Sequence, residues 1–313
     1  MFNCPRIIIS DEKKLENKKE IFRKSYNKNE DKILLVTDFD YTLFNKYNYL
    51  TGEKYESSYG MYNKEVFGGD QKDFQDKRKM LHGIYLKYEE DTSIDENIRK
   101  EKIKEWNTRA LGYMLHPNLT RDSFRKMVEI KKKEINFKKN VKKFYEKLIE
   151  LNIPIIIVSG GIKEIILEVL KLLEIKGLEE YIEKKRMLFV ANEFIFDENE
   201  KCTDFNKNII YGYNKGEYVK KLVDEFFPKV ENVFVLGDLD IDYKSIEQLN
   251  LNKDKNVIGI GYPYFYPDEI KNKDFNFENN ELINSFKKVY DVNLLLEEGY
   301  DYPLELLNIF ENK

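Results

Sequence analysis

Four aspartates, grouped in two short motifs, give the sequence its clearest chemistry. Asp38 and Asp40 form a D-x-D pair, and Asp238 and Asp242 stand four residues apart much later in the chain. In a poorly solvated cleft these carboxylates would repel one another strongly. A hard divalent cation relieves that repulsion, and Mg²⁺ prefers a few carboxylates together with water and phosphate oxygens. The four aspartates therefore predict a Mg²⁺ site that would polarise a phosphoryl group.

The spacing of the D-x-D pair assigns a role to each member. In extended backbone, residues i and i+2 face the same side, so Asp38 and Asp40 would both reach the bound group. We expect Asp38 to be the nucleophile, which becomes phosphorylated transiently. Asp40 is then the acid–base residue, which protonates the leaving oxygen and later activates water. The competing interpretations are structural, because the pair could cap a turn and Asp242 could be a helix N-cap.

A phosphate group in this site would also need hydrogen-bond donors and a cation. Ser159 is followed by Gly160 and Gly161, which allow a close approach to the backbone, and the next helix would point its positive end at the anion. Ser159 could instead only cap that helix. Lys215, just before a helix in the stretch 213–216, is our prediction for the cation that opposes the phosphoryl charge.

Each motif follows a short apolar run, so the elements that position the motifs can be predicted. The runs are rich in β-branched residues and lack polar alternation, which is typical of strands buried on both faces of a parallel sheet. They cover 33–36, 153–158, 233–236 and 257–260, with 187–190 as a weaker fifth. Ligands bind in the crevice outside the carboxyl ends of such strands, so the motifs should meet there.

Helical patterns between these runs predict the fold class. Apolar residues recur at helical spacing over 141–151, 162–173 and 218–226, and strands that alternate with such helices form βαβ units. The stretch 46–136 holds charges and amphipathic patterns but no convincing buried strand. We therefore expect an α/β protein, with a Rossmann-like parallel-sheet core of residues 1–45 and 137–313 and an inserted, mainly helical cap of residues 46–136.

Composition excludes several other classes of protein. The 313 residues carry 53 basic and 57 acidic side chains, a net charge of −4, which argues against a nucleic-acid polymer as partner. With only Cys4 and Cys202, a disulfide framework is not expected, and a reducing compartment is. No apolar run reaches the length of a membrane span or a signal-peptide core. We expect a soluble, cytoplasmic protein that is a monomer or a weak homo-oligomer.

Three motifs resemble, in order and placement, those of the haloacid-dehalogenase (HAD) superfamily. They are Asp38-Phe39-Asp40-Tyr41-Thr42-Leu43, Ser159-Gly160-Gly161, and Gly237-Asp238 with Asp242. More narrowly, the chain is similar to the pyrimidine 5′-nucleotidase family, also called cytosolic 5′-nucleotidase III. That likeness runs from about Lys32 to the last strands and includes Ser58-Tyr59-Gly60, Glu105-Trp106 and Asn214-Lys215.

The resemblance implies an HAD-like core, a helical cap, Mg²⁺ and nucleoside 5′-monophosphate substrates. It implies that Asp38 is the nucleophile and that Asp40, the acid–base residue, also offers its carbonyl to the metal. Its further implications concern binding: Asp238 as metal ligand, Asp242 in support of the metal site, Ser159, Gly160 and Lys215 on phosphate, and Glu89 near the cap glutamate that reads the base. Glu89 lies in an acidic stretch, so a solvated helix face is an equal alternative.

The chain departs from the family pattern at three places. Ser159-Gly160-Gly161 stands where the family has Ser-Ala-Gly, and Ile241 stands where it has glycine. Ala110 and Leu111, after the cap tryptophan, stand where it tends to carry Ser and His. The phosphate chemistry is untouched by these changes, whereas the base preference is left open.

The expected function is Mg²⁺-dependent hydrolysis of nucleoside 5′-monophosphates, with pyrimidine bases favoured, to nucleoside and phosphate. The reaction would pass through an aspartyl phosphate, which could also transfer its phosphoryl group to another nucleoside. One alternative is an HAD phosphatase for a sugar phosphate or phosphoserine. The other is a non-catalytic protein that binds a nucleotide or phosphate.

Overall fold

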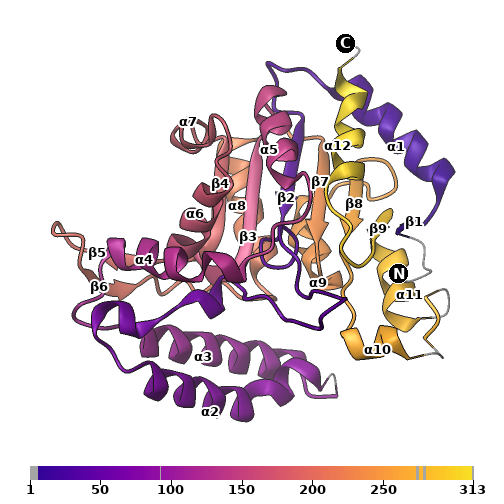
Figure 1. Ribbon diagram of the computed structural model, residues 1–313. Helices are drawn as coiled ribbons and strands as arrows, with labels where there is room; N and C mark the ends of the chain where they lie inside the picture. Colours follow the sequence, from indigo (N-terminus) through magenta and orange to yellow (C-terminus); the bar gives the residue numbers. More distant parts are fainter. Residues whose placement is uncertain (1–5, 92, 273–274, 278–279, 312–313) are drawn as a thin grey trace.

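A seven-stranded sheet forms the centre of the computed structural model, which describes residues 6–91, 93–272, 275–277 and 280–311. The strands lie in the order β1-β9-β8-β7-β2-β3-β4, and all are parallel except β1, which runs antiparallel to β9 (Figure 1). Their bounds are β1 Ile7–Ile9, β2 Ile33–Thr37, β3 Ile155–Ile162, β4 Met187–Asn192, β7 Asn232–Gly237, β8 Val257–Gly261 and β9 Val292–Leu294. The mostly parallel α/β sheet predicted from the apolar runs is confirmed.

Helices cover both faces of this sheet, and the strand residues alternate between the two layers. Leu35 of β2 packs in one core cluster, to which α1, α5, α6 and α12 contribute. Its neighbours Leu34 and Val36 pack in a second cluster, with residues of α8, α9 and α11. These helices are α1 Glu12–Ser25, α5 Val141–Glu150, α6 Lys163–Leu172, α8 Lys215–Phe226, α9 Asp240–Tyr243, α11 Glu281–Val289 and α12 Asp301–Leu307. Burial on both faces explains why the strands lack polar alternation.

The stretch 46–136 is helical in the part of the chain that the structure describes. Its elements are η1 Tyr59–Met61, η2 Lys64–Phe67, α2 Gln71–Glu90, α3 Glu96–Met114, α4 Arg121–Lys131 and η3 Lys132–Glu134. Helices α2 and α3 pack against each other beyond the carboxyl edge of the sheet, whereas α4 packs against α6 of the core (Figure 1). The chain crosses between these regions on two hydrogen-bonded segments, because Asn45 N donates to Asn136 O at 2.8 Å and Lys138 N to Leu43 O at 2.9 Å. The division at 45/46 and 136/137 stays a prediction.

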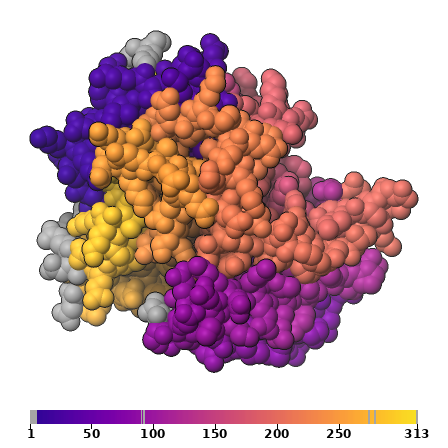
Figure 2. All heavy atoms as spheres, turned by 180° about the vertical axis from the view of Figure 1, so that it is seen from behind, coloured from indigo at the N-terminus to yellow at the C-terminus, as the bar shows by residue number. Residues whose placement is uncertain are grey.

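The remaining elements complete the surface. Strands β5 Phe194–Phe196 and β6 Cys202–Phe205 form an antiparallel hairpin, which projects from the side of the molecule (Figure 2). The others are α7 Leu178–Glu183, α10 Pro267–Lys271, η4 Lys244–Leu249 and η5 Asn308–Phe310. Cys4 lies outside the described residues, and Cys202 is a free cysteine. Of the helices that the structure describes, none is both long enough and apolar enough to cross a bilayer.

The beginning of the chain is bound to the sheet by buried polar contacts. Strand β1 pairs with β9, and the Ser10 hydroxyl donates to Tyr290 O at 2.7 Å. In α1 the Lys18 ammonium, 2% exposed, pairs with Asp291 at 2.7 Å, and the other Asp291 oxygen accepts from Gly259 N at 2.9 Å. A buried carboxylate with a cation and an amide donor is well satisfied, so this segment is an integral part of the core.

Candidate active site

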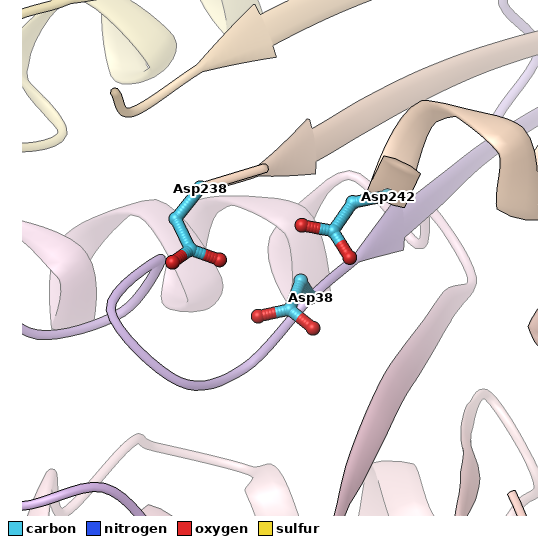
Figure 3. A group of neighbouring side chains, drawn as sticks. All are labelled: Asp38, Asp238 and Asp242. Carbon is cyan, nitrogen blue, oxygen red and sulfur yellow. The ribbon is translucent and has the colours of Figure 1, made fainter. Parts of the chain in front are cut away.

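Three of the four predicted aspartates meet at the carboxyl edge of the sheet. Strands β2 and β7 are parallel neighbours with Thr37 opposite Leu236, so the residues that follow them, Asp38 and Asp238, emerge close together. Asp242 joins them from α9, the short helix after β7. One carboxylate oxygen from each of the three lies within 4.8 Å of the others, and all three residues are buried (Figure 3). Adjacent strand ends therefore create the cluster.

Lys215 supplies a positive charge inside this cluster. As the first residue of α8, its ammonium donates to Asp38 Oδ1 at 3.0 Å and to Asp242 Oδ1 at 2.9 Å, and the residue is 8% exposed. Asp242 also accepts a hydrogen bond from Leu239 N through Oδ2 at 3.1 Å. One ammonium against three carboxylates leaves the cluster with excess negative charge when all are ionised.

The protonation of the cluster reflects this imbalance. Burial raises the pKa of Asp38 to about 8, although the Lys215 ammonium opposes the rise. Burial and the neighbouring carboxylates likewise hold the pKa of Asp238 well above its usual range. Burial by itself would lower the pKa of Lys215, but Asp242 and Asp38 outweigh that effect and raise it. A carboxylate must be ionised to attack phosphorus. One lysine does not balance three ionised carboxylates, and a bound divalent cation with oxygen ligands would supply the missing positive charge.

Asp40 is held by Ser58 and is not one of the three clustered carboxylates. Ser58 donates to Asp40 Oδ1 from its backbone amide at 2.6 Å and to Oδ2 from its hydroxyl at 2.7 Å. Burial raises the pKa of Asp40, and both hydrogen bonds from Ser58 oppose the rise. The side chain of Asp40 is therefore outside the carboxylate cluster, which is compatible with an acid–base role. Coordination of a metal by its carbonyl stays a prediction.

The serine–glycine motif lies beside Ser58. Strand β3 continues through the motif to Ile162, farther than the apolar run predicted, and Gly161 N donates to Ser159 Oγ at 2.9 Å. A methyl group on Gly161 would lie 2.3 Å from Ser58 Oγ, whereas one on Gly160 would meet no atom within 4 Å. Helix α6 begins at Lys163, and its N-cap residue, Ile162, makes no side-chain capping hydrogen bond. These features suit a phosphate-binding turn.

A pocket of about 440 Å³ lies in the helical stretch 46–136, and one of its lining residues is adjacent to Ser58 in the sequence. Its described lining residues come from η1, α2 and α3: Tyr59, Gln75, Arg78, Lys79, Leu81, His82, Trp106, Asn107 and Ala110. Tyr59 directly follows Ser58, the partner of Asp40. Glu89, predicted to read the base, is exposed in the last turn of α2 and is not among these residues.

Sequence reasoning missed two lysines near Asp238 and gave no role to Ser58. The Lys46 ammonium lies 3.2 Å from the centroid of the Tyr264 ring, and burial lowers its pKa to about 8 while the charge of Asp238 opposes the shift. Lys138 is buried and donates to Asn45 Oδ1 at 3.2 Å. No signal separated these lysines from the many others. Ser58 was noticed only as part of the family likeness.

Curated relatives and a solved structure resemble this chain over most of its length. The 7-methylguanosine phosphate-specific 5′-nucleotidase A of Xenopus laevis is 24% identical over 277 residues, 87% of this chain and 85% of the relative. The human 7-methylguanosine phosphate-specific 5′-nucleotidase is 24% identical over 213 residues, 66% of each chain. A crystal structure of cytosolic 5′-nucleotidase IIIB bound to cytidine superposes with a TM-score of 0.77 at 17% identity, covering 99% of this chain and 95% of that one.

The family itself is shown by a model that spans most of the sequence. The model described as pyrimidine 5′-nucleotidase (UMPH-1) matches residues 41–310. The helices and strands around the acidic cluster all lie within or directly beside this range. The chain therefore belongs to the pyrimidine 5′-nucleotidase family.

Proposed function

We propose that this 5′-nucleotidase hydrolyses nucleoside 5′-monophosphates through a phosphorylated Asp38, with Mg²⁺ in the acidic cluster. The observation that carries the proposal is the position of Asp38: its carboxylate is buried at the end of β2, bonded to Lys215 and clustered with Asp238 and Asp242. A buried carboxylate beside a lysine and further carboxylates suits a nucleophile that works on a charged phosphoryl group.

The first half of the reaction forms the phosphoenzyme. Asp38 attacks phosphorus while Asp40, kept in place by Ser58, gives a proton to the departing 5′ oxygen of the nucleoside. Lys215 exchanges one of its carboxylate contacts for a phosphoryl oxygen, and Ser159 with the Gly160 amide holds the others. Mg²⁺, bound by Asp38, Asp238 and Asp242 with the Asp40 carbonyl, would shield the phosphoryl charge from the attacking carboxylate.

The second half releases phosphate. Asp40, now ionised, removes a proton from a water molecule, which attacks the phosphorus of the aspartyl phosphate and regenerates Asp38. A nucleoside hydroxyl in place of that water would give transfer instead of hydrolysis. The fraction transferred is therefore set by how well a second nucleoside competes with water.

The helical pocket next to Ser58 is the place where we expect the base. It is lined by Trp106, His82 and Tyr59, and aromatic side chains of this kind suit a planar ring. Pyrimidine nucleotides are the substrates we propose, in line with the family description and with the cytidine bound to cytosolic 5′-nucleotidase IIIB. The curated relatives named for 7-methylguanosine phosphate provide the competing expectation. We also propose a cytosolic location, from the names of similar proteins.

Phosphate release from a panel of esters tests the proposal. The panel holds uridine, cytidine, guanosine and adenosine 5′-monophosphates, ribose 5-phosphate and phosphoserine, each with Mg²⁺ and with a chelator. We expect Mg²⁺-dependent release that is fastest with the nucleotides. Asp38→Asn should lower kcat by at least about three orders of magnitude, because it removes the attacking carboxylate. Preference for phosphoserine or ribose 5-phosphate would reject the nucleotidase function, and full activity of D38N would reject the nucleophile.

A further inference from the structure

The helical pocket has positively charged side chains in its wall. Its lining includes two basic side chains, Arg78 and Lys79, both on α2. Among the described residues that line it there is no carboxylate. The rest of the wall is aromatic, amide or aliphatic. A ring that enters this pocket therefore meets cationic side chains and, among the described lining residues, no anionic one.

Arg78 is held in a way that leaves its hydrogen-bond donors available. The centre of its guanidinium lies 5.0 Å from the Tyr59 ring centroid and 5.8 Å from that of Phe74. Its one hydrogen bond to a described residue, to Gln75 Oε1, is long at 3.5 Å. No carboxylate of the described residues pairs with it within 4.0 Å. Apart from the long contact with Gln75, its N–H groups have no acceptor among the described residues and are available to a ligand in the pocket.

Two carboxylates adjoin lining residues in the sequence, and both are paired with cations. Asp76, which follows Gln75, pairs with Lys72 at 3.1 Å. Glu105, which precedes Trp106, pairs with Lys102 at 2.9 Å and with Arg109 at 3.4 Å. Trp106 itself stacks on Tyr85, with ring centroids 6.1 Å apart and planes 10° from parallel. Glu105 is thus engaged elsewhere, and one face of the indole is partly occupied. A cationic ring would be stabilised by an unpaired carboxylate and by open aromatic faces on both of its sides. The ion pairs of Glu105 and the stacking of Tyr85 on Trp106 weaken both contributions.

We propose that Arg78 is a specificity-determining residue, which makes the pocket select uncharged bases with carbonyl or imine acceptors and reject bases that carry a positive charge. The inference rests on the proposed nucleotidase function and deepens it. Uracil, cytosine and guanine offer such acceptors to the guanidinium edge. An N7-methylated guanine would bring its positive charge against Arg78 and Lys79, and like charges brought together without a counter-ion discriminate strongly.

The kinetic test compares a substrate with a charged base, a substrate with an uncharged base and a substrate without a base. The substrates are 7-methylguanosine 5′-monophosphate, uridine 5′-monophosphate and ribose 5-phosphate, and the measured quantity is kcat/KM for each. For the wild type we expect the uridine nucleotide to be preferred over the methylated one by at least about tenfold, the scale of a lost charge or hydrogen-bond contact. Arg78→Gln should shrink that ratio by about tenfold, by raising KM for the uridine nucleotide with little change in kcat.

Two variants and one substrate control for indirect effects. Arg78→Lys keeps the charge and should keep most of the rejection of the methylated base. Lys72→Gln removes a cation from the exposed side of α2, where Lys72 pairs with Asp76 at 3.1 Å, and should behave as the wild type. Ribose 5-phosphate carries no base, so its kcat/KM should be the same in R78Q and in the wild type.

Trp106 gives a readout that does not depend on turnover, because it is the single tryptophan of the chain. In the D38N background, uridine 5′-monophosphate should change the intrinsic fluorescence of Trp106 as it binds, and R78Q should shift that titration to higher concentration. Absence of any fluorescence response, with uridine 5′-monophosphate turned over normally by the wild type, would overturn the assignment of this pocket to the base.

Other outcomes separate the inference from the function beneath it. If the nucleotides are hydrolysed but the methylated one is preferred, or if R78Q lowers kcat/KM for all three substrates equally, the role of Arg78 is wrong and the nucleotidase function stands. If no nucleotide is hydrolysed and another ester is, both are overturned. Retained discrimination in R78K, lost discrimination in R78Q and an unchanged ribose 5-phosphate reaction together support the inference.

Discussion

Ser58 holds both oxygens of the Asp40 carboxylate, one through its backbone amide and one through its hydroxyl. Asp40 belongs to the loop that follows β2, whereas Ser58 directly precedes η1. The contact therefore joins the helical region to the loop that carries the proposed nucleophile. Hydrogen bonds to a carboxylate favour its ionised form, so Ser58 keeps Asp40 closer to the state in which it can accept a proton.

Ser58→Ala should move the pH dependence of the reaction. Loss of the hydroxyl removes one of the two hydrogen bonds that oppose the raised pKa of Asp40, so that pKa rises further. The acidic limb of the kcat profile should move to higher pH by about one unit, since one unit corresponds to about 1.4 kcal/mol, the scale of one such bond. The profile is measured by phosphate release, with Ser58→Thr as the variant that keeps a hydroxyl. An unshifted limb in S58A would remove Asp40 from the acid–base role.

The two glycines of the phosphate motif should respond in opposite ways to a methyl group. A Cβ on Gly161 would lie 2.3 Å from Ser58 Oγ and 3.0 Å from Ser159 Oγ, so either serine must move. Gly161→Ala should lower kcat/KM by about a hundredfold, as misplacements of about 1 Å do. Gly160→Ala is the matched control: its Cβ meets nothing within 4 Å, and activity should stay close to that of the wild type. Equal activities of the two variants would contradict this geometry.

Asp238→Asn should separate metal affinity from stability. Removal of a buried oxygen anion should weaken Mg²⁺ binding, which titration calorimetry measures. Changes to residues that only support the metal ligands lower the affinity by roughly tenfold or more, and the loss of a direct ligand should lower it further. The metal-free protein should melt at a higher temperature, because burial and neighbouring carboxylates penalise the ionised form of Asp238. Asp240→Asn removes an exposed carboxylate of the same motif and serves as control. Unchanged Mg²⁺ affinity in D238N would place the metal elsewhere.

Glu164 should make stability fall as the pH rises. In the first turn of α6 it is 7% exposed, its Oε1 accepts from Phe194 N at 3.2 Å, and burial raises its pKa to about 7. Between about pH 4.5 and pH 7 the unfolded chain has released this proton while the folded chain keeps it, so the free energy of unfolding decreases with pH. The full effect is on the order of 3 kcal/mol.

Glu164→Gln should abolish that pH dependence. Urea unfolding at about pH 5 and about pH 8 should show a gain for E164Q over the wild type that is larger at the higher pH, because the amide never has to lose a proton inside the core. Glu179→Gln changes an exposed residue of α7 and serves as the control. In this variant the free energy of unfolding should differ between the two pH values by as much as it does in the wild type. A gain of the same size at both pH values would contradict the raised pKa.

The central strands could be predicted from sequence for a simple physical reason. Strands β2, β7 and β8 are buried on both faces, so their residues are apolar without alternation and stand out from a highly charged chain. The edge strand β1 and its neighbour β9 have three residues each, too short for such a pattern to be distinctive. Strand β1 pairs with β9 near the other end of the chain, and no sequence pattern indicated that pairing.

The candidate site was predictable where chemistry and strand ends coincide, and unpredictable where it depends on side-chain direction. The meeting of Asp38, Asp238 and Asp242 follows from adjacent parallel strands. That Asp40 turns to Ser58 depends on the path of the loop after β2, in which Tyr41 takes a positive φ of 59°. Spacing alone cannot reveal that turn. The same is true of Arg78, which is one cation among many until its surroundings are known.

The amino-terminal segment has a consequence for anyone who shortens this protein. It lies before the part of the chain that the family model matches, and looks dispensable on that ground. A chain that began at residue 27 would lack Lys18 and leave the buried Asp291 without its cation. Tyr290, the neighbour of Asp291, donates from its hydroxyl to Leu239 O at 2.6 Å, within the turn that carries Asp238 and Asp242. Removal of the amino-terminal segment would therefore disturb the turn that carries the proposed metal ligands. In an activity assay, this loss would resemble a defect of the active site itself.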